Sequence, residues 1–174
     1  MTTSIFDSEV QALLDAAQTA SGALFPSPGD WRDQCIYFLM VDRFNNPCAP
    51  PKNTPFDAEF SEFQGGTFNG IREKLGYLKD LGVGALWLSP VLKNCQFETH
   101  AYHGYGIQNF LAIEPRFASS PEMAENELRS LVDEAHRSGI YVIFDIVLHH
   151  AGDVFEYVID GNGQAESPWQ DQPK

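Results

Sequence analysis

The chain has 174 residues, of which 43% are hydrophobic and 13% aromatic, enough for one ordinary globular domain. Its 11 Lys and Arg residues against 24 Asp and Glu residues give a formal net charge of -13, which repels polyphosphates and anionic lipids. Nucleic acid and membrane surfaces are therefore excluded as favoured partners. Residues 1–20 lack the basic and apolar regions of a secretory signal, so we expect a soluble cytoplasmic protein.

The first half of the chain predicts two helices and two strands. Apolar residues at helical spacing predict a short amphipathic helix over 5–20, which a linker with Pro and Gly follows. The almost wholly apolar run 35–41 predicts a strand buried on both faces, as in a parallel sheet. Several prolines and a Gly pair predict a loop over 45–66. A second helix is predicted over 71–81, and a second buried strand over 85–88.

The second half repeats the order of helix and strand. Residues 94–116 form a long aromatic and polar segment, which is typical of a functional loop in a compact domain. Ser120 and Pro121 are a favoured pair at a helix start, and apolar spacing continues that helix up to Gly139. The apolar run 140–148 predicts a third buried strand.

This alternation of strands and helices requires parallel strands joined by right-handed crossovers, as in a doubly wound sheet or part of a barrel. In both folds, active groups gather at the carboxyl ends of the strands. Polar or interrupted segments follow all three predicted strands, at residues 42–44, 89–91 and 145–150. We therefore expect a functional site where these segments meet.

Asp145 interrupts an apolar run, where an unpaired carboxylate would cost several kcal/mol, so it requires a dedicated partner. A structural role in bracing a loop is an equal alternative. If the strand continues through its neighbours, His149 and His150 point to opposite faces and cannot share one metal. A zinc site that adds His100 and His103 does not match the helix-borne HExxH spacing.

Tyr102, Tyr105 and Phe110 offer flat apolar faces with polar rims, which suit the apolar face of a sugar ring. On these aromatic residues alone, packing in the core or under a lid is the favoured interpretation. A flavodoxin-like or dinucleotide-binding sheet is a further alternative, but it requires phosphate-binding glycines after the first strand, where residues 42–46 read DRFNN.

Three ordered motifs resemble glycoside hydrolase family 13, which contains the α-amylases and their transferase relatives. The first runs from GGTF at 65–68 through KLGYLKDLGV to LWLSP at 86–90. The second, YHGYG at 102–106, resembles the YHGYW segment of the family. The third, DIVLHH at 145–150, resembles the first conserved region, DxVxNH, at the end of the third barrel strand. The resemblance extends over about residues 31–157.

The resemblance implies an α/β fold that is a partial TIM (β/α)8 barrel, with about the first three strands and two crossover helices. A short N-terminal helix and linker occupy residues 1–30, and the barrel part occupies 31–150. Residues 151–174 correspond to the start of a truncated inserted domain, which their polar composition predicts to be disordered. A complete barrel needs roughly 250 residues, more than this chain has.

The same resemblance assigns the substrate-binding residues. Tyr105 stacks on the sugar next to the cleaved bond, His150 hydrogen-bonds that sugar, and Asp145 braces the site through an arginine on the next strand. His103 is a further binding residue. His149 stands where the family usually has an asparagine that helps hold calcium, and a neutral imidazole is a poor ligand for this hard cation. As a cofactor, calcium is therefore expected in a full-length parent protein rather than in this chain.

The catalytic acids of the family lie on later strands, and a retaining mechanism needs two carboxyl groups about 5 Å apart. No acid after His150 matches a family motif, so no catalytic residue is assigned. The leading hypothesis is an N-terminal fragment, inactive alone, of a retaining glycosidase or glucanotransferase that acts on starch-like or maltooligosaccharide substrates. Isomerisation or phosphorolysis of small sugars shares the same motifs.

A non-catalytic carbohydrate-binding or interaction module is the alternative function. It would use Tyr105, His103 and His150 as half of a sugar site. In either case, three barrel strands leave two unpaired edges, so we expect self-association through them.

Overall fold

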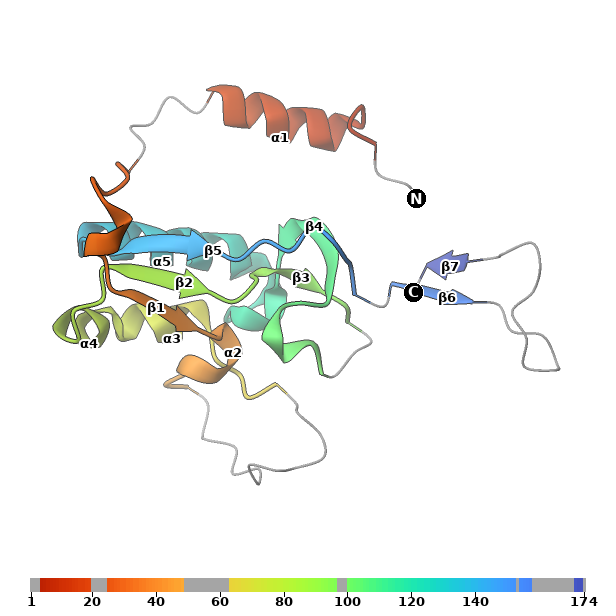
Figure 1. Cartoon of the computed structure of the whole chain (residues 1–174). Coiled ribbons are helices and arrows are strands. Elements are labelled where there is room, and N and C mark those ends of the chain that lie inside the picture. The colour runs from red at the N-terminus through yellow and green to blue at the C-terminus, as the bar shows by residue number, and fades with distance from the viewer. Residues whose placement is uncertain are drawn as a thin grey trace.

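A computed structural model gives the fold, and it describes residues 4–19, 25–48, 63–96, 100–152, 154–157 and 171–173. Its centre is a parallel sheet of three strands in the order β1, β2, β5 (Figure 1). Their bounds are Ile36–Leu39 for β1, Ala85–Leu88 for β2 and Tyr141–Phe144 for β5. The predicted alternation of parallel strands and helices is confirmed.

Helices cover one face of this sheet. The connection from β1 to β2 carries α3 (Phe68–Glu73) and α4 (Leu75–Asp80), and α5 (Ala124–Arg137) connects β2 to β5. The core lies between these helices and the sheet, and its members include Leu39, Leu86, Leu88, Ile71, Leu78 and Leu131. Burial on this face is the main source of stability, because apolar area removed from water is the dominant favourable term in folding.

The opposite face of the sheet is open in the described part of the chain. Ile36, Phe38 and Trp87 are 48%, 44% and 40% exposed, and the rings of Phe38 and Trp87 contact each other edge to face. The prediction that all three strands are buried on both faces is therefore wrong. The two outer strands are edges of the described sheet, and α3, α4 and α5 cover only its other face.

Two predicted strands are shorter in the structure. The run 35–41 forms a strand only up to Leu39, because the chain then turns into the short helix α2 (Val41–Phe44). The run 140–148 forms a strand only up to Phe144, because its neighbour β2 ends at Leu88 and offers no further partner.

The predicted helix over 71–81 begins earlier, at the start of α3, and is interrupted at Lys74. The predicted loop 94–116 holds an antiparallel pair, β3 (Leu92–Asn94) and β4 (Ile107–Ile113), with register shifts that hide the alternation of a regular strand. Short 3₁₀ turns complete the connections, at Trp31–Asp33, Ala101–His103, Pro115–Phe117 and Pro121–Met123.

The two ends of the chain add small elements. The predicted N-terminal helix is confirmed as α1 (Ser8–Thr19). β6 (Phe155–Tyr157) and β7 (Asp171–Pro173) pair antiparallel, and the residues between them lie outside the described part, so the predicted disorder of residues 151–174 stays a prediction. None of the described helices combines the length and apolar content that crossing a bilayer requires.

Glycines allow the start of α3 to pack against the turn after β1. A Cβ atom on Gly70 would lie 1.8 Å from the carbonyl oxygen of Asn45, and one on Gly66 would lie 2.1 Å from that of Val41. The Asn45 side-chain amide donates to the Gly70 backbone carbonyl at 3.0 Å, and the backbone carbonyl of Asn45 accepts from the Thr67 backbone amide at 3.1 Å. This close backbone approach is the physical reason for glycines in this segment.

Substitution Gly70→Ala is expected to lower the free energy of unfolding by about 2–3 kcal/mol, because the obstructing atom is backbone and cannot move away cheaply. Gly76→Ala is the matched control, since nothing lies within 4 Å of a Cβ there and α4 gains up to about 1 kcal/mol. Urea unfolding measures the free energy of unfolding of both variants. Equal changes in the two would contradict the explanation that Gly70 is required by the close approach of the Asn45 backbone.

Candidate functional site

The carboxyl ends of β1, β2 and β5 all point toward α2 and the β3–β4 pair (Figure 1). This arrangement follows from parallel pairing, which places the end of every strand at the same edge of the sheet. From the sequence we expect residues 42–44, 89–91 and 145–150 to lie close together, and this expectation depends on the parallel pairing of the strands. Each strand end is held there in a different way.

The end of β1 is held by a buried carboxylate. Asp42 is 1% exposed, and its oxygens accept from the backbone amides of Gln64 at 2.9 and 3.0 Å and of Gly65 at 2.9 Å. The Arg43 Nε atom lies 3.3 Å from the same carboxylate, and its guanidinium group stacks 3.9 Å from the centre of the Tyr102 ring. Asp42 therefore connects two loops of the site.

The segment after β2 is held by a buried polar network that the sequence did not reveal. The Asn94 side-chain oxygen accepts from the Gly106 backbone amide at 2.8 Å, and the backbone amide of Asn94 donates to the fully buried carboxylate of Glu114 at 2.8 Å. Arg116 Nε pairs with that carboxylate at 2.6 Å. Asn94 lies 12 positions before Gly106 and 20 before Glu114, so no local pattern marks these contacts.

Gly104 brings the loop onto the end of β2. Its φ of +89° is the left-handed conformation that favours glycine, and a Cβ atom would lie 2.2 Å from the Pro90 carbonyl oxygen. The buried Pro90 is the second residue after β2, so this approach places Tyr105 beside the strand ends.

Tyr105 is the centre of the candidate site. Its hydroxyl donates to Asp145 Oδ2 at 2.9 Å, and its backbone amide donates to His103 Nδ1 at 2.9 Å. Its carbonyl oxygen lies 3.0 Å from His150 Nε2. The structure thus gathers all four residues predicted to bind substrate around one aromatic ring.

Asp145 lies just beyond β5 and is half-buried, so the prediction of an acid inside a buried strand is wrong. Its side-chain partner in the described part of the chain is Tyr105, 40 positions earlier. The condition under which His149 and His150 would point to opposite faces, a strand that continues through them, is not met. Because β5 has already ended, their side chains need not alternate, and their ring nitrogens lie 3.0 Å apart.

The environment of Tyr105 raises the pKa of its phenol above the usual value, mainly through burial and then through the hydrogen bond and negative charge of Asp145. The phenol is therefore neutral at physiological pH and remains a hydrogen-bond donor to the carboxylate. A neutral ring with a fixed hydroxyl is suited to lie flat against an uncharged ligand.

The residues around His149 do not fit a calcium ion. Its Nε2 atom contacts His150, and calcium prefers oxygen ligands to imidazole nitrogen. Among the described residues, no three His, Cys, Asp or Glu side chains are grouped so that they can hold a metal. We therefore assign no step of any reaction to calcium in this chain.

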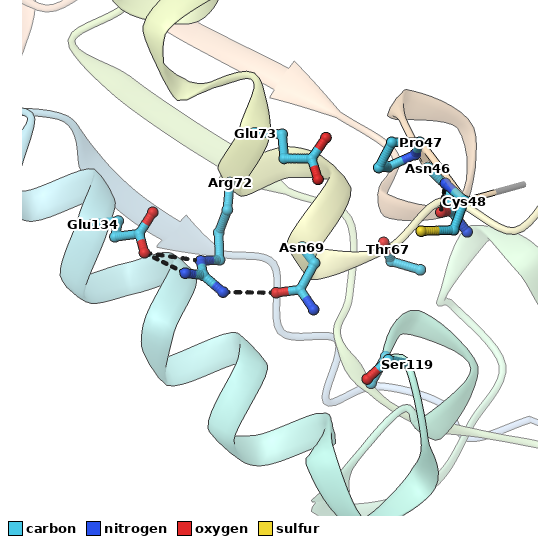
Figure 2. A pocket seen from close by; sticks show the side chains of 10 residues that line it. Asn46, Pro47, Cys48, Thr67, Asn69, Arg72, Glu73, Ser119 and Glu134 are labelled. Atoms are coloured by element: carbon cyan, nitrogen blue, oxygen red, sulfur yellow. Dashed lines mark hydrogen bonds and ion pairs between the residues drawn. The ribbon is translucent and has the colours of Figure 1, made fainter.

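A separate pocket of about 620 Å³ lies between α3 and α5 and shares no lining residue with the Tyr105 cluster (Figure 2). Arg72 forms an ion pair with Glu134 across it and donates from Nη1 to Asn69 Oδ1 at 2.7 Å. The Thr67 hydroxyl caps α3 by accepting from the Gly70 amide at 3.0 Å. These polar groups satisfy one another, and their bonds tie the two helices together.

The fold and the cluster define the class of protein: a parallel α/β unit whose strand ends present an aromatic ring, a carboxylate and imidazoles. The profile described as the alpha-amylase catalytic domain matches residues 27–172. The chain belongs to the alpha-amylase family, glycoside hydrolase family 13, as its motifs indicated.

Relatives within this family differ in activity. The chain is 33% identical to the periplasmic alpha-amylase of Escherichia coli K12, over 82% of its own length and 24% of that relative. The alpha-amylase of Geobacillus thermoleovorans, complexed with acarbose, is 31% identical with a TM-score of 0.57, and the match covers 81% of this chain and 33% of that one. A cyclomaltodextrin glucanotransferase is 30% identical with a TM-score of 0.56, over 68% of this chain and 26% of that one. The chain thus spans no more than a third of the length of these relatives.

Tyr105→Phe is expected to cost about 1 kcal/mol of stability at neutral pH through the lost hydrogen bond. Because the folded pKa of Tyr105 lies above the unfolded one, its contribution is complete below the unfolded pKa and is lost as pH rises through the folded pKa. In urea unfolding at increasing alkaline pH, the free energies of unfolding of the wild type and of Tyr105→Phe should therefore converge. Tyr77→Phe, at an exposed position on α4, controls for the loss of one phenol. A stability difference that stays constant with pH contradicts the raised pKa.

Proposed function

We propose that this chain supplies the first three strands of the catalytic barrel in an enzyme that hydrolyses or transfers α-glucosyl units. The substrates would be starch-like glucans or maltooligosaccharides. The observation that carries the proposal is the Tyr105 cluster at the carboxyl ends of three parallel strands, because barrel enzymes bind substrate at this edge. Membership of the alpha-amylase family supports the class of substrate.

The cluster suggests a division of roles in binding. The Tyr105 ring offers an apolar face to a sugar ring, while Asp145 fixes its hydroxyl and thereby its tilt. His103, which lies 5.7 Å from Tyr105 between ring centroids and is tilted by 32°, extends the aromatic surface. His150 lies at the exposed rim, where a sugar hydroxyl can approach its ring.

The same cluster does not supply the cleavage chemistry. A retaining mechanism needs a nucleophilic and a proton-donating carboxyl group about 5 Å apart. In the described cluster the carboxyl group is that of Asp145, which accepts from Tyr105 and so serves to orient it. We assign cleavage to residues outside this chain, in a longer parent protein.

A carbohydrate-binding module without catalysis is the second candidate function. The observation that favours it is the same cluster, which has the ring and the hydrogen-bonding groups of a sugar site but not the paired acids. Both candidate functions predict that this chain binds the sugar equally well. They differ in whether the product of the natural reading frame that contains the chain cleaves the sugar.

Tyr105→Ala is expected to weaken binding of a maltooligosaccharide at least about tenfold, because an aromatic contact at the centre of a site dominates its affinity. Calorimetric titration of the protein with maltoheptaose measures this loss. Tyr77→Ala, which removes an exposed ring on α4, should leave the affinity unchanged.

Reducing-sugar release from soluble starch by the product of the natural reading frame then separates the two candidates. Release supports the enzyme, and binding without release supports the module. If the wild-type protein does not bind maltoheptaose, neither candidate holds.

We further expect the chain to self-associate through its open sheet face and edges. Phe38→Lys places a charge on that face and should shift sedimentation toward monomer, whereas Tyr77→Lys on the helix-covered side should not. Sedimentation of the wild type that is independent of concentration contradicts the expectation.

A further inference from the structure

His149 contacts the candidate site through His150. Its Nε2 atom lies 3.0 Å from His150 Nδ1, and the two rings meet edge to face with centroids 4.4 Å apart. At its other nitrogen, His150 Nε2 lies 3.0 Å from the Tyr105 carbonyl oxygen. The three groups thus form one chain of contacts that ends on the backbone of the central aromatic residue.

We propose that His149 is a positioning residue, which donates a hydrogen bond to His150 and holds it against the Tyr105 backbone, rather than a cation ligand. This function of His149 is independent of the substrate. Its consequence for sugar binding rests on the proposed function.

The direction of the hydrogen bonds follows from chemistry. A carbonyl oxygen can only accept, so the proton between His150 and Tyr105 belongs to His150 Nε2. A neutral imidazole carries a single N–H, which leaves His150 Nδ1 as an acceptor. His149 must then carry its proton on Nε2 and donate it to His150 Nδ1. With both rings neutral, each nitrogen at these two contacts has one assigned role.

Packing does not provide the same restraint, because both histidines are exposed. The orientation of the His150 ring therefore depends on hydrogen bonds at its two nitrogens. Without His149, the Nδ1 side is open to water and the ring can rotate away from the Tyr105 carbonyl.

Tyr105 is held at three points: its hydroxyl by Asp145, its amide by His103 and its carbonyl by His150. The contact with Asp145 fixes the side chain, and the contact with His103 fixes the backbone amide of Tyr105. The contact with His150 fixes the peptide group between Tyr105 and the next residue. Loss of the third contact frees that peptide and broadens the orientations of the ring. His149 thus acts on the sugar-stacking surface without touching it.

The use of His149 as a donor also removes its Nε2 atom from metal binding, because that nitrogen is protonated in this arrangement and a metal ligand must offer a lone pair. The lone pair that remains, on Nδ1, is a poor ligand for calcium, which prefers oxygen. The structure therefore assigns to hydrogen bonding a position that the family resemblance associates with calcium.

Nitrogen-15 NMR of the histidine-labelled protein tests the hydrogen bonds directly, at a pH where the rings are neutral. The chain has 5 histidines, and His136, stacked on Phe25 beside the start of β5, serves as the internal reference. We expect the Nε2–H tautomer for both His149 and His150, with a slowly exchanging proton on His150. In His149→Leu this exchange should accelerate several-fold, and His149→Gln, which keeps an N–H donor, should restore it.

A second readout addresses the metal. Millimolar calcium should leave the His149 and His150 signals unchanged. A calcium-dependent shift of the His149 signal, or exchange at His150 that is unaffected in His149→Leu, overturns the proposal. Because position 149 is exposed, thermal melting of both variants is expected to match the wild type and serves as the check on folding.

The consequence for binding is measured separately. Affinity for maltoheptaose should fall about 2- to 10-fold in His149→Leu, as expected for one neutral hydrogen bond, and recover in His149→Gln. Unchanged affinity in His149→Leu, with wild-type binding present, refutes the effect on the sugar site. If the wild type itself does not bind the sugar, the proposed function fails while the NMR experiment still decides the role of His149.

Discussion

Parallel pairing of three strands is the constraint on which the rest of this structure depends. A parallel strand cannot return by a tight turn, so each connection must cross the sheet and carry helices along one face. The same pairing brings three chain segments, separated by some fifty residues each, to one edge. The apolar core and the Tyr105 cluster are two consequences of this single arrangement.

Buried polar groups then give the edge its definite shape. The Asp42 carboxylate is satisfied by backbone amides of the loop before α3, and Glu114 is satisfied by Asn94 and Arg116. A buried carboxylate without such partners is strongly unfavourable, so these bonds restrict each loop to one position. The position of Tyr105 is set by the loops that these buried carboxylates hold in place. The site is therefore held by the scaffold rather than by its own contacts alone.

The open face of the sheet and the incomplete chemistry of the cluster are related. Phe38 and Trp87 expose apolar rings on the face that the described helices leave uncovered. Asp145 orients Tyr105 and, among the described residues, is not paired with a second acid. A sheet that lacks further strands lacks both the layer that would cover these rings and the strand ends that would bring more acids. This common origin is consistent with the small share of its relatives' length that the chain spans.

The sequence by itself determined the order of elements and the approximate places of the three strands, because apolar runs and helical spacing are local properties of the chain. It also led to the prediction of Tyr105, Asp145 and the histidines as site residues, since strand ends and family motifs are local as well. Only the tertiary structure decided that β5 stops at Phe144, because a strand lasts only as long as its neighbour pairs with it. Only the tertiary structure shows that Tyr105 bonds to Asp145 and that the His149 ring contacts the ring of His150. Contacts of this kind depend on where distant segments meet, which no local pattern encodes.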